Sequence, residues 1–137
     1  MIRKISDILK EKLCTYSFEF FSPKTDAGIV KFYDTIKELA KLKPDFLSVT
    51  YGAGGSKRET TTKIVDEIQK RFDISVIHHL TCIGHTKEEL IDIISKIKAT
   101  GVKNILALRG DPPIGVKEWK KMPGGFEYSF QLIDLIN

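Results

Sequence analysis

The strongest constraint on the fold is an alternation of strand-like and helix-like segments along the whole chain. Each extended, β-branched or aromatic run is followed by apolar residues at helical spacing. Repeated βα units of this kind predict a parallel sheet joined by right-handed crossovers. The predicted strands are residues 15–22, 45–51, 75–82 and 103–108, and an amphipathic helix precedes them within residues 1–13. No linker interrupts the series, so residues 1–137 are expected to form a single domain.

Helix boundaries are marked by three local signals. Ser56 with Glu59 and Thr86 with Glu89 each fit the S/T-x-x-E capping box, in which both side chains satisfy free amides at a helix start. Gly101 stands where a helix C-terminal cap belongs. The pattern therefore predicts helices that begin after Ser56 and Thr86.

Composition and charge exclude several classes of protein. The 137 residues are 42% hydrophobic, which is too apolar for a disordered chain, and no uninterrupted apolar run is long enough to cross a membrane. Cys14 and Cys82 lack the spacing of a disulfide framework or a zinc site, which indicates a reduced, cytoplasmic compartment. The net charge of +4 is spread along the chain. The basic cluster from Lys117 to Lys121 is interpreted as a solvated loop, so no nucleic-acid partner is expected.

Two architectures for a parallel sheet remain: an open doubly wound sheet and a closed (β/α)₈ barrel of TIM type. Strands sandwiched between helices are apolar on both faces, whereas here one parity of the first three strands is polar. Polar side chains near the ends of the strands suggest the mouth of a barrel, where active sites are built. Such a barrel usually needs about 250 residues, so the chain is predicted to hold about four βα units, a half barrel. The polar parity comprises Ser17, Glu19, Ser48, Thr50, His79 and Thr81.

Glu19 is the sharpest single candidate for chemistry. It stands between Phe18 and Phe20 inside a predicted strand, an unfavourable place for an unpaired carboxylate. An apolar environment raises the pKa of a carboxyl group, which suits a general acid. The alternative is a glutamate on an edge strand that points to water, and the residues alone leave both open.

Two glycine-containing segments follow predicted strands. Arg109, Gly110 and Asp111 come directly after the fourth strand and combine a phosphate-binding cation, room for a flat ligand and an acceptor. A turn with a solvated ion pair explains them equally. The segment 50–56 resembles a phosphate cradle without the spacing of a known fingerprint, and a tight turn explains it as well.

The histidines, Cys82 and Trp119 receive separate interpretations. His79 lies on the polar parity and is a candidate ligand-binding residue, His78 is expected beneath a helix, and His85 in a loop. Their spacing does not make a metal site. Cys82 is expected in the core, and Trp119 is a lone aromatic residue in a polar loop.

Four motifs in order resemble the methylenetetrahydrofolate reductase family: SFEFFSPKT (17–25), FLSVTYGAGGS (46–56), HLTCIGHT (79–86) and ALRGDPP (107–113). The resemblance covers essentially the whole chain after the first helix. It implies a flavoprotein (β/α)₈ barrel that reduces 5,10-methylenetetrahydrofolate to 5-methyltetrahydrofolate, with FAD and with NADH or NADPH as reductant. Family members are oligomers, so a homo-oligomer is expected.

The same resemblance implies roles for individual residues. Glu19 matches the catalytic general acid, and Asp111 matches the aspartate beside the flavin that also contacts the folate; both are expected to bind substrate. Thr50 falls where the family contacts flavin and nicotinamide nucleotide. The family has alanine where this chain has Ser129, and Gln131 begins a second departure. The expected FAD contacts are Thr50, Tyr51, Ala53, His79, Leu108, Arg109, Gly110, Asp111, Tyr128 and Ser129.

A half barrel leaves several explanations open. The chain could be a truncated product, the first half of a split enzyme completed by a second chain, or a subunit that closes its barrel with a second copy. It could instead be a non-catalytic binding or assembly module. Another flavin- or phosphate-binding barrel, such as a proline-dehydrogenase-like enzyme, is a weaker alternative. In each incomplete form the isolated chain is expected to bind FAD weakly and to show little reductase activity.

Overall fold

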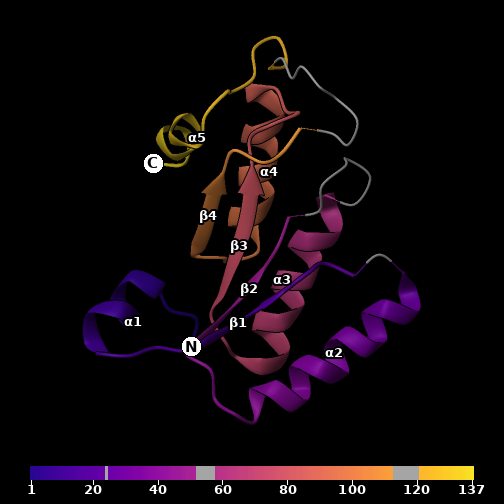
Figure 1. Cartoon of the computed structure of the whole chain (residues 1–137), viewed down its shortest axis with the longest axis vertical. Coiled ribbons are helices and arrows are strands. Elements are labelled where there is room, and N and C mark those ends of the chain that lie inside the picture. The colour runs from indigo at the N-terminus through magenta and orange to yellow at the C-terminus, as the bar shows by residue number, and fades with distance from the viewer. Residues whose placement is uncertain (24, 52–57, 113–120) are drawn as a thin grey trace.

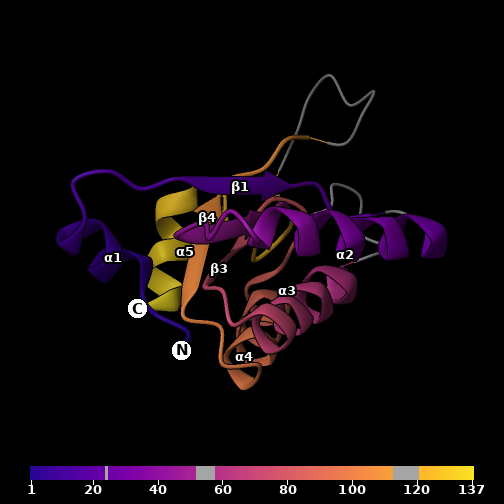
Figure 2. The same cartoon turned by 90° about the horizontal axis from the view of Figure 1, so that it is seen from below.

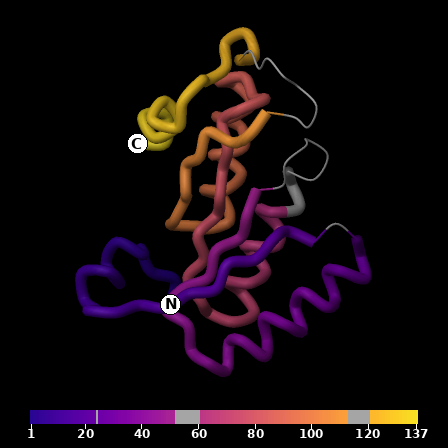
Figure 3. Tube along the Cα trace, in the orientation of Figure 1, coloured from indigo at the N-terminus to yellow at the C-terminus, as the bar shows by residue number. Residues whose placement is uncertain are grey.

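The structure, a computed structural model, describes residues 1–23, 25–51, 58–112 and 121–137, with the side chains of 58–60 left aside. Helices and strands alternate along this part of the chain, as the colouring of Figures 1 and 3 shows. The elements are α1 (Ile5–Glu11), β1 (Ser17–Phe20), α2 (Asp26–Ala40), β2 (Phe46–Val49), α3 (Arg58–Phe72), β3 (Val76–Thr81), α4 (Lys87–Ala99), β4 (Asn104–Leu108) and α5 (Ser129–Ile136). The predicted alternation is confirmed, with strands shorter than their apolar runs.

The four strands form one parallel sheet in the order β1-β2-β3-β4. Their register places Glu19 opposite Ser48 and Val49 opposite His78. Farther along β3, His79 stands opposite Leu106. Since neighbours in sequence are neighbours in the sheet, each crossover advances by one strand in the same direction.

The helices after the strands pack on one face of the sheet, which we call the helix face. Phe32 and Ile36 of α2 and Ile68 of α3 share a core with Leu47 and Val49. A second core joins β3 and β4 to α4 and α5. In Figure 2, α2, α3 and α4 all lie on the same side of β1. The second core consists of Leu80, Cys82, Leu90, Ile97 and Leu132, all less than 2% exposed.

The opposite face, which we call the open face, carries the other parity of every strand. Glu19, Ser48, Ile77 and His79 lie on it because they alternate with the core residues of the helix face. In β4, Asn104 is followed on this face by Leu106 and Leu108, and Leu106 is 41% exposed. The polar parity shared by the first three strands therefore does not continue through the carboxyl end of β4, where Leu106 and Leu108 lie.

The N-terminal segment crosses the beginnings of the strands. The Arg3 backbone N–H donates to Ser75 Oγ at 2.8 Å, and the Ile5 N–H donates to Asn104 Oδ1 at 2.8 Å. The Asn104 amide nitrogen donates in turn to the Arg3 carbonyl at 2.9 Å. Ile5 and Ile8 are buried, so α1 docks on the sheet through one side.

The predicted cap signals have distinct outcomes. Both hydrogen bonds of the capping box between Thr86 and Glu89 are present, and Gly101 has a φ of +76° at the end of α4, which confirms these two signals. The box of Ser56 and Glu59 lies outside the residues and side chains that the structure describes.

The architecture confirms an α/β fold with a parallel sheet. A doubly wound sheet reverses its strand order and covers both faces with helices, whereas this sheet does neither over its four strands. Consecutive order with one covered face is the arrangement of part of a barrel. None of the described helices is long and apolar enough to cross a membrane.

Candidate functional site

Three polar side chains from three neighbouring strands meet on the open face: Glu19 of β1, Ser48 of β2 and His79 of β3. The Ser48 hydroxyl donates to Glu19 Oε2 at 2.9 Å. His79 Nε2 lies 3.5 Å from the same oxygen. The sheet register produces this group because Glu19 and Ser48 are direct partners across β1 and β2.

Burial differs sharply within this group. The Glu19 side chain is 58% exposed, whereas that of His79 is 7% exposed. Burial lowers the pKa of His79, and the charge of the neighbouring carboxylate opposes this change only in part. His79 is therefore neutral at neutral pH. Its Nε2 is buried and has no hydrogen-bond partner among the described residues, since the contact with Glu19 does not have hydrogen-bond geometry.

The phenylalanines beside Glu19 do not shield its carboxyl group. Phe18 and Phe20 pack against the core on the helix face, and Phe21 is 83% exposed. Neighbours in sequence point to opposite faces of a strand, so an apolar flank does not create an apolar environment. Of the two alternatives that the sequence left open, the structure has the exposed glutamate on an edge strand.

A second polar group lies behind the sheet and is separate from the open face. His78 is fully buried, as expected of a histidine beneath a helix: its Nδ1 donates to the His79 carbonyl at 2.7 Å and its Nε2 lies 3.1 Å from Thr62 Oγ1 of α3. Burial lowers the pKa of His78 to about 4. Tyr51 lies beside it, with its hydroxyl 3.4 Å from Nε2 of the buried loop residue His85.

Gly110 follows β4 with a φ of +86°. A Cβ atom there would lie 2.4 Å from Ile83 Cγ2 and 2.9 Å from Thr81 Cβ. The chain itself therefore requires this glycine, and room for a flat ligand is not needed to explain it. Arg109 and Asp111 on either side are exposed, and Arg109 Nε donates to the Glu127 carbonyl at 3.1 Å.

The start of α5 explains one departure from the family pattern. Gln131 Oε1 accepts from the backbone N–H groups of Glu127 at 2.9 Å and Tyr128 at 3.0 Å. Gln131 thus caps the helix that begins at Ser129. Tyr128 stacks on Phe130 with ring centroids 5.7 Å apart.

The remaining expected site residues divide by position. Thr50 continues β2, and Leu108 ends β4 on the open face, so both lie at the carboxyl ends of the strands. Three strand spacings, about 14 Å, separate the strand of Glu19 from the strand that precedes Asp111. Ala53, Trp119 and most of the basic cluster at 117–121 fall outside the described residues. Every expected contact of these side chains with FAD or folate stays a prediction.

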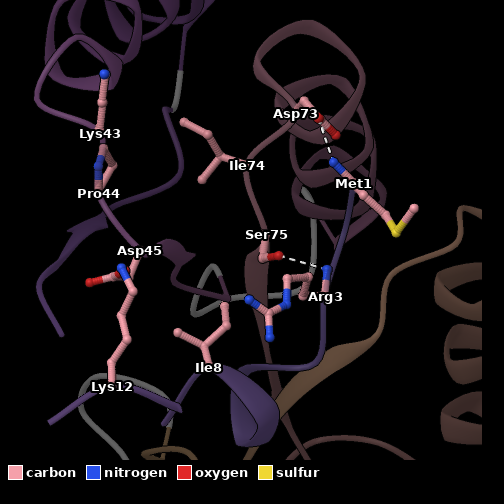
Figure 4. A pocket seen from close by; sticks show the side chains of 10 residues that line it. All are labelled: Met1, Arg3, Ile8, Lys12, Lys43, Pro44, Asp45, Asp73, Ile74 and Ser75. Carbon is pink, nitrogen blue, oxygen red and sulfur yellow. Dashed lines mark hydrogen bonds and ion pairs between the residues drawn. The ribbon is translucent and has the colours of Figure 1, made fainter. Parts of the chain in front are cut away.

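A cavity of the described structure lies at the other end of the strands. It has a volume of about 260 Å³ and is lined by residues that precede β2 and β3, together with the N-terminal segment (Figure 4). Two ion pairs lie in its lining: the Met1 ammonium contacts Asp73, and Lys12 contacts Asp45. It therefore shares no residue with the group on the open face.

Other observations bear on ligand chemistry. Among the described residues no cluster of three or more histidine, cysteine or acidic side chains could hold a metal ion. Cys82 is fully buried, which confirms its place in the core, and burial raises the pKa of its thiol. No motif in the sequence assigns a role to Ser48. Its position in the polar parity could have predicted the contact with Glu19, since aligning SFEF with FLSV places the two residues side by side.

Comparison with known proteins agrees with the motif pattern. The sequence model of the methylenetetrahydrofolate reductase family matches residues 4–137. A rice (Oryza sativa subsp. japonica) protein named probable methylenetetrahydrofolate reductase (NADH) is 34% identical over 136 residues, which is 99% of this chain and 23% of that protein. Methylenetetrahydrofolate reductase 1 of Schizosaccharomyces pombe is 41% identical over 139 residues, 97% of this chain and 23% of that protein.

A bacterial relative matches over a shorter stretch. The 5,10-methylenetetrahydrofolate reductase of Salmonella typhimurium is 41% identical over 99 residues, 72% of this chain and 33% of that protein. The chain thus spans between 23% and 33% of the length of these three relatives. Since the family match extends over nearly all of its residues, the chain belongs to the methylenetetrahydrofolate reductase family.

Proposed function

We propose that this chain forms the first half of the catalytic barrel of a flavin-dependent methylenetetrahydrofolate reductase. The reaction is the reduction of 5,10-methylenetetrahydrofolate to 5-methyltetrahydrofolate, with FAD as cofactor and NADH or NADPH as reductant, in the cytoplasm. The observation that carries the proposal is the group of Glu19, Ser48 and His79 on a sheet face that no described helix covers.

The open face offers polar groups that suit a flavin. His79 Nε2 is buried on this face and lacks a hydrogen-bond partner among the described residues. Arg109 is an exposed cation at the carboxyl end of β4. We infer that His79, Thr50 and the segment Arg109 to Asp111 hold FAD, which supplies the hydride chemistry that amino-acid side chains lack.

Glu19 is proposed to handle the proton of the folate reaction. Its exposed carboxyl group is accessible to a ligand on the open face, while Ser48 holds one of its oxygens. In this role Glu19 protonates the imidazolidine ring nitrogen that leaves the methylene carbon, which opens the ring to the reactive N5 iminium. Burial lowers the pKa of His79, so this neighbour of Glu19 is neutral at neutral pH.

The proposed site needs further βα units to close it. β1 and β4 are the two edges of the described sheet, and β4 exposes Leu106 on the open face. The relatives are three to four times longer than their matched stretches. The missing units would come from a continuation of the chain, a second polypeptide or a second copy in a homo-oligomer. We therefore expect the 137 residues alone to bind FAD weakly and to reduce little folate.

A hybrid enzyme tests the proposal. Residues 1–137 replace the aligned segment of the Schizosaccharomyces pombe relative, which supplies the rest of the protein. The hybrid is expected to bind FAD and form 5-methyltetrahydrofolate. Glu19→Gln should slow the folate half-reaction by about 10²- to 10⁴-fold, because it removes the general acid. It should change the rate of flavin reduction by NADH or NADPH by less than about twofold, since that half-reaction uses no proton from Glu19.

The control is Glu38→Gln, which removes an exposed carboxylate on α2 that pairs with Lys41. It should leave both half-reactions unchanged. A flavin-loaded hybrid in which E19Q reduces folate as fast as the parent would contradict the proposed role. A hybrid that binds flavin and folate but catalyses neither flavin reduction nor folate reduction would favour the non-catalytic binding module.

A further inference from the structure

The two oxygens of the Glu19 carboxyl group have different surroundings. Oε2 accepts the Ser48 hydroxyl at 2.9 Å and faces His79 Nε2 at 3.5 Å. Oε1 accepts no hydrogen bond from the described residues. Since the side chain is 58% exposed, Oε1 is the oxygen that a ligand on the open face can reach.

The donor to Oε2 is held more firmly than the acceptor. Ser48 is 6% exposed in β2, which pairs with β1 on one side and β3 on the other. Glu19 stands on the edge strand β1, and its long side chain is free to change rotamer unless something holds it. A short, buried hydroxyl on a central strand is therefore the fixed reference for a mobile, exposed carboxyl group.

We propose that Ser48 is the positioning residue for Glu19, which it holds by Oε2 so that Oε1 carries the proton transferred to the folate. This inference rests on the proposed function and names a residue that the family motifs leave without a role. The hydroxyl bond persists through the step: the Oε1–H bond breaks, an N–H bond forms on the leaving ring nitrogen, and Oε2 remains the acceptor. The bond strengthens as the carboxylate charge develops, because hydrogen bonds to ionised acceptors are stronger.

The first experiment measures the orientation of Glu19 on the isolated chain, without flavin or folate. Three-bond NMR couplings report whether its χ1 angle occupies one rotamer or an average. We expect one dominant rotamer in the parent, averaging in Ser48→Ala, and the parent value again in Ser48→Thr, which keeps a hydroxyl. Ser17→Ala is the matched control, because Ser17 is an exposed serine two residues before Glu19 on the same face.

Averaged couplings in the parent, or parental couplings in S48A, would overturn the inference. Averaging in S17A equal to that in S48A would do the same, since it would show a general loosening of β1. These outcomes do not depend on any enzymatic activity. The orientation result can therefore stand even where the proposed function fails.

The second experiment uses the hybrid enzyme. S48A is expected to slow the folate half-reaction by about 10- to 100-fold, the size typical of a hydrogen bond to a charged group. The KM for folate and the rate of flavin reduction should change by less than about threefold. In the E19Q background S48A should have no further effect, because its partner is already altered. Equal losses from S48A in the parent and E19Q backgrounds would refute a role exerted through Glu19.

Discussion

The replacement of Gly110 by alanine tests how the turn after β4 is built. The new Cβ would lie 2.4 Å from Ile83 Cγ2 and 2.9 Å from Thr81 Cβ, both inside van der Waals contact. Gly110 also has a φ of +86°, a conformation that costs an L-residue about 1–2 kcal/mol. Overpacking adds about 1–3 kcal/mol. Gly110→Ala should therefore lower the free energy of unfolding by about 2–5 kcal/mol.

Gly101→Ala separates the two contributions. Gly101 has a similar φ of +76°, but a Cβ there meets no atom within 4 Å. Its replacement should cost only the backbone strain, about 1–2 kcal/mol. Urea unfolding followed by circular dichroism measures both variants. With a slope of about 2 kcal/mol per molar urea, a loss of about 3 kcal/mol moves the midpoint by about 1.5 M. Equal midpoints for G110A and G101A would refute the steric argument.

Three further predictions concern the helix face and its caps. The pKa of His78 is about 4 in the folded chain, against 6.5 for an unperturbed histidine side chain. The unfolded chain therefore binds this proton more tightly than the folded chain. Stability is therefore full above about pH 6.5 and falls by about 3 kcal/mol as the pH drops to 4; urea titrations at several pH values should show a smaller loss in His78→Gln. Thr86→Ala should cost about 1 kcal/mol in the same assay, because α4 loses its capping box. Leu132→Ala should cost about 2–5 kcal/mol since this residue is fully buried, whereas Ile133→Ala, at a position 45% exposed, should cost less than 1 kcal/mol; similar losses would contradict the assigned packing of α5.

Local sequence signals were sufficient for the order of elements and for the faces of the strands. The parity that set Leu47 and Val49 apart from Ser48 is the parity that divides core from open face. Thr86 and Gly101 marked the ends of α4 correctly because caps depend on residues within one turn.

Properties that depend on contacts between residues distant in sequence could not be predicted from local sequence signals. The flanks of Glu19 suggested shielding, but the exposure of a strand residue is set by the elements on its own face. The contact of Ser48 with Glu19 follows from the register of two strands, which no single motif contains. For Gly110 the sequence leaves a ligand site and a turn open, and the close approach of Ile83 from the loop after β3 requires the glycine without a ligand.

The docking of α1 orders events during synthesis of the chain. Its anchoring bonds join Arg3 to Ser75 and Ile5 to Asn104, partners that are 72 and 99 positions later. Helix α1 must therefore wait until three βα units and the start of a fourth have left the exit tunnel. At typical elongation rates this interval is on the order of 5–20 seconds. The segment that contains α1 is thus secured only after the four strands have begun to form the sheet.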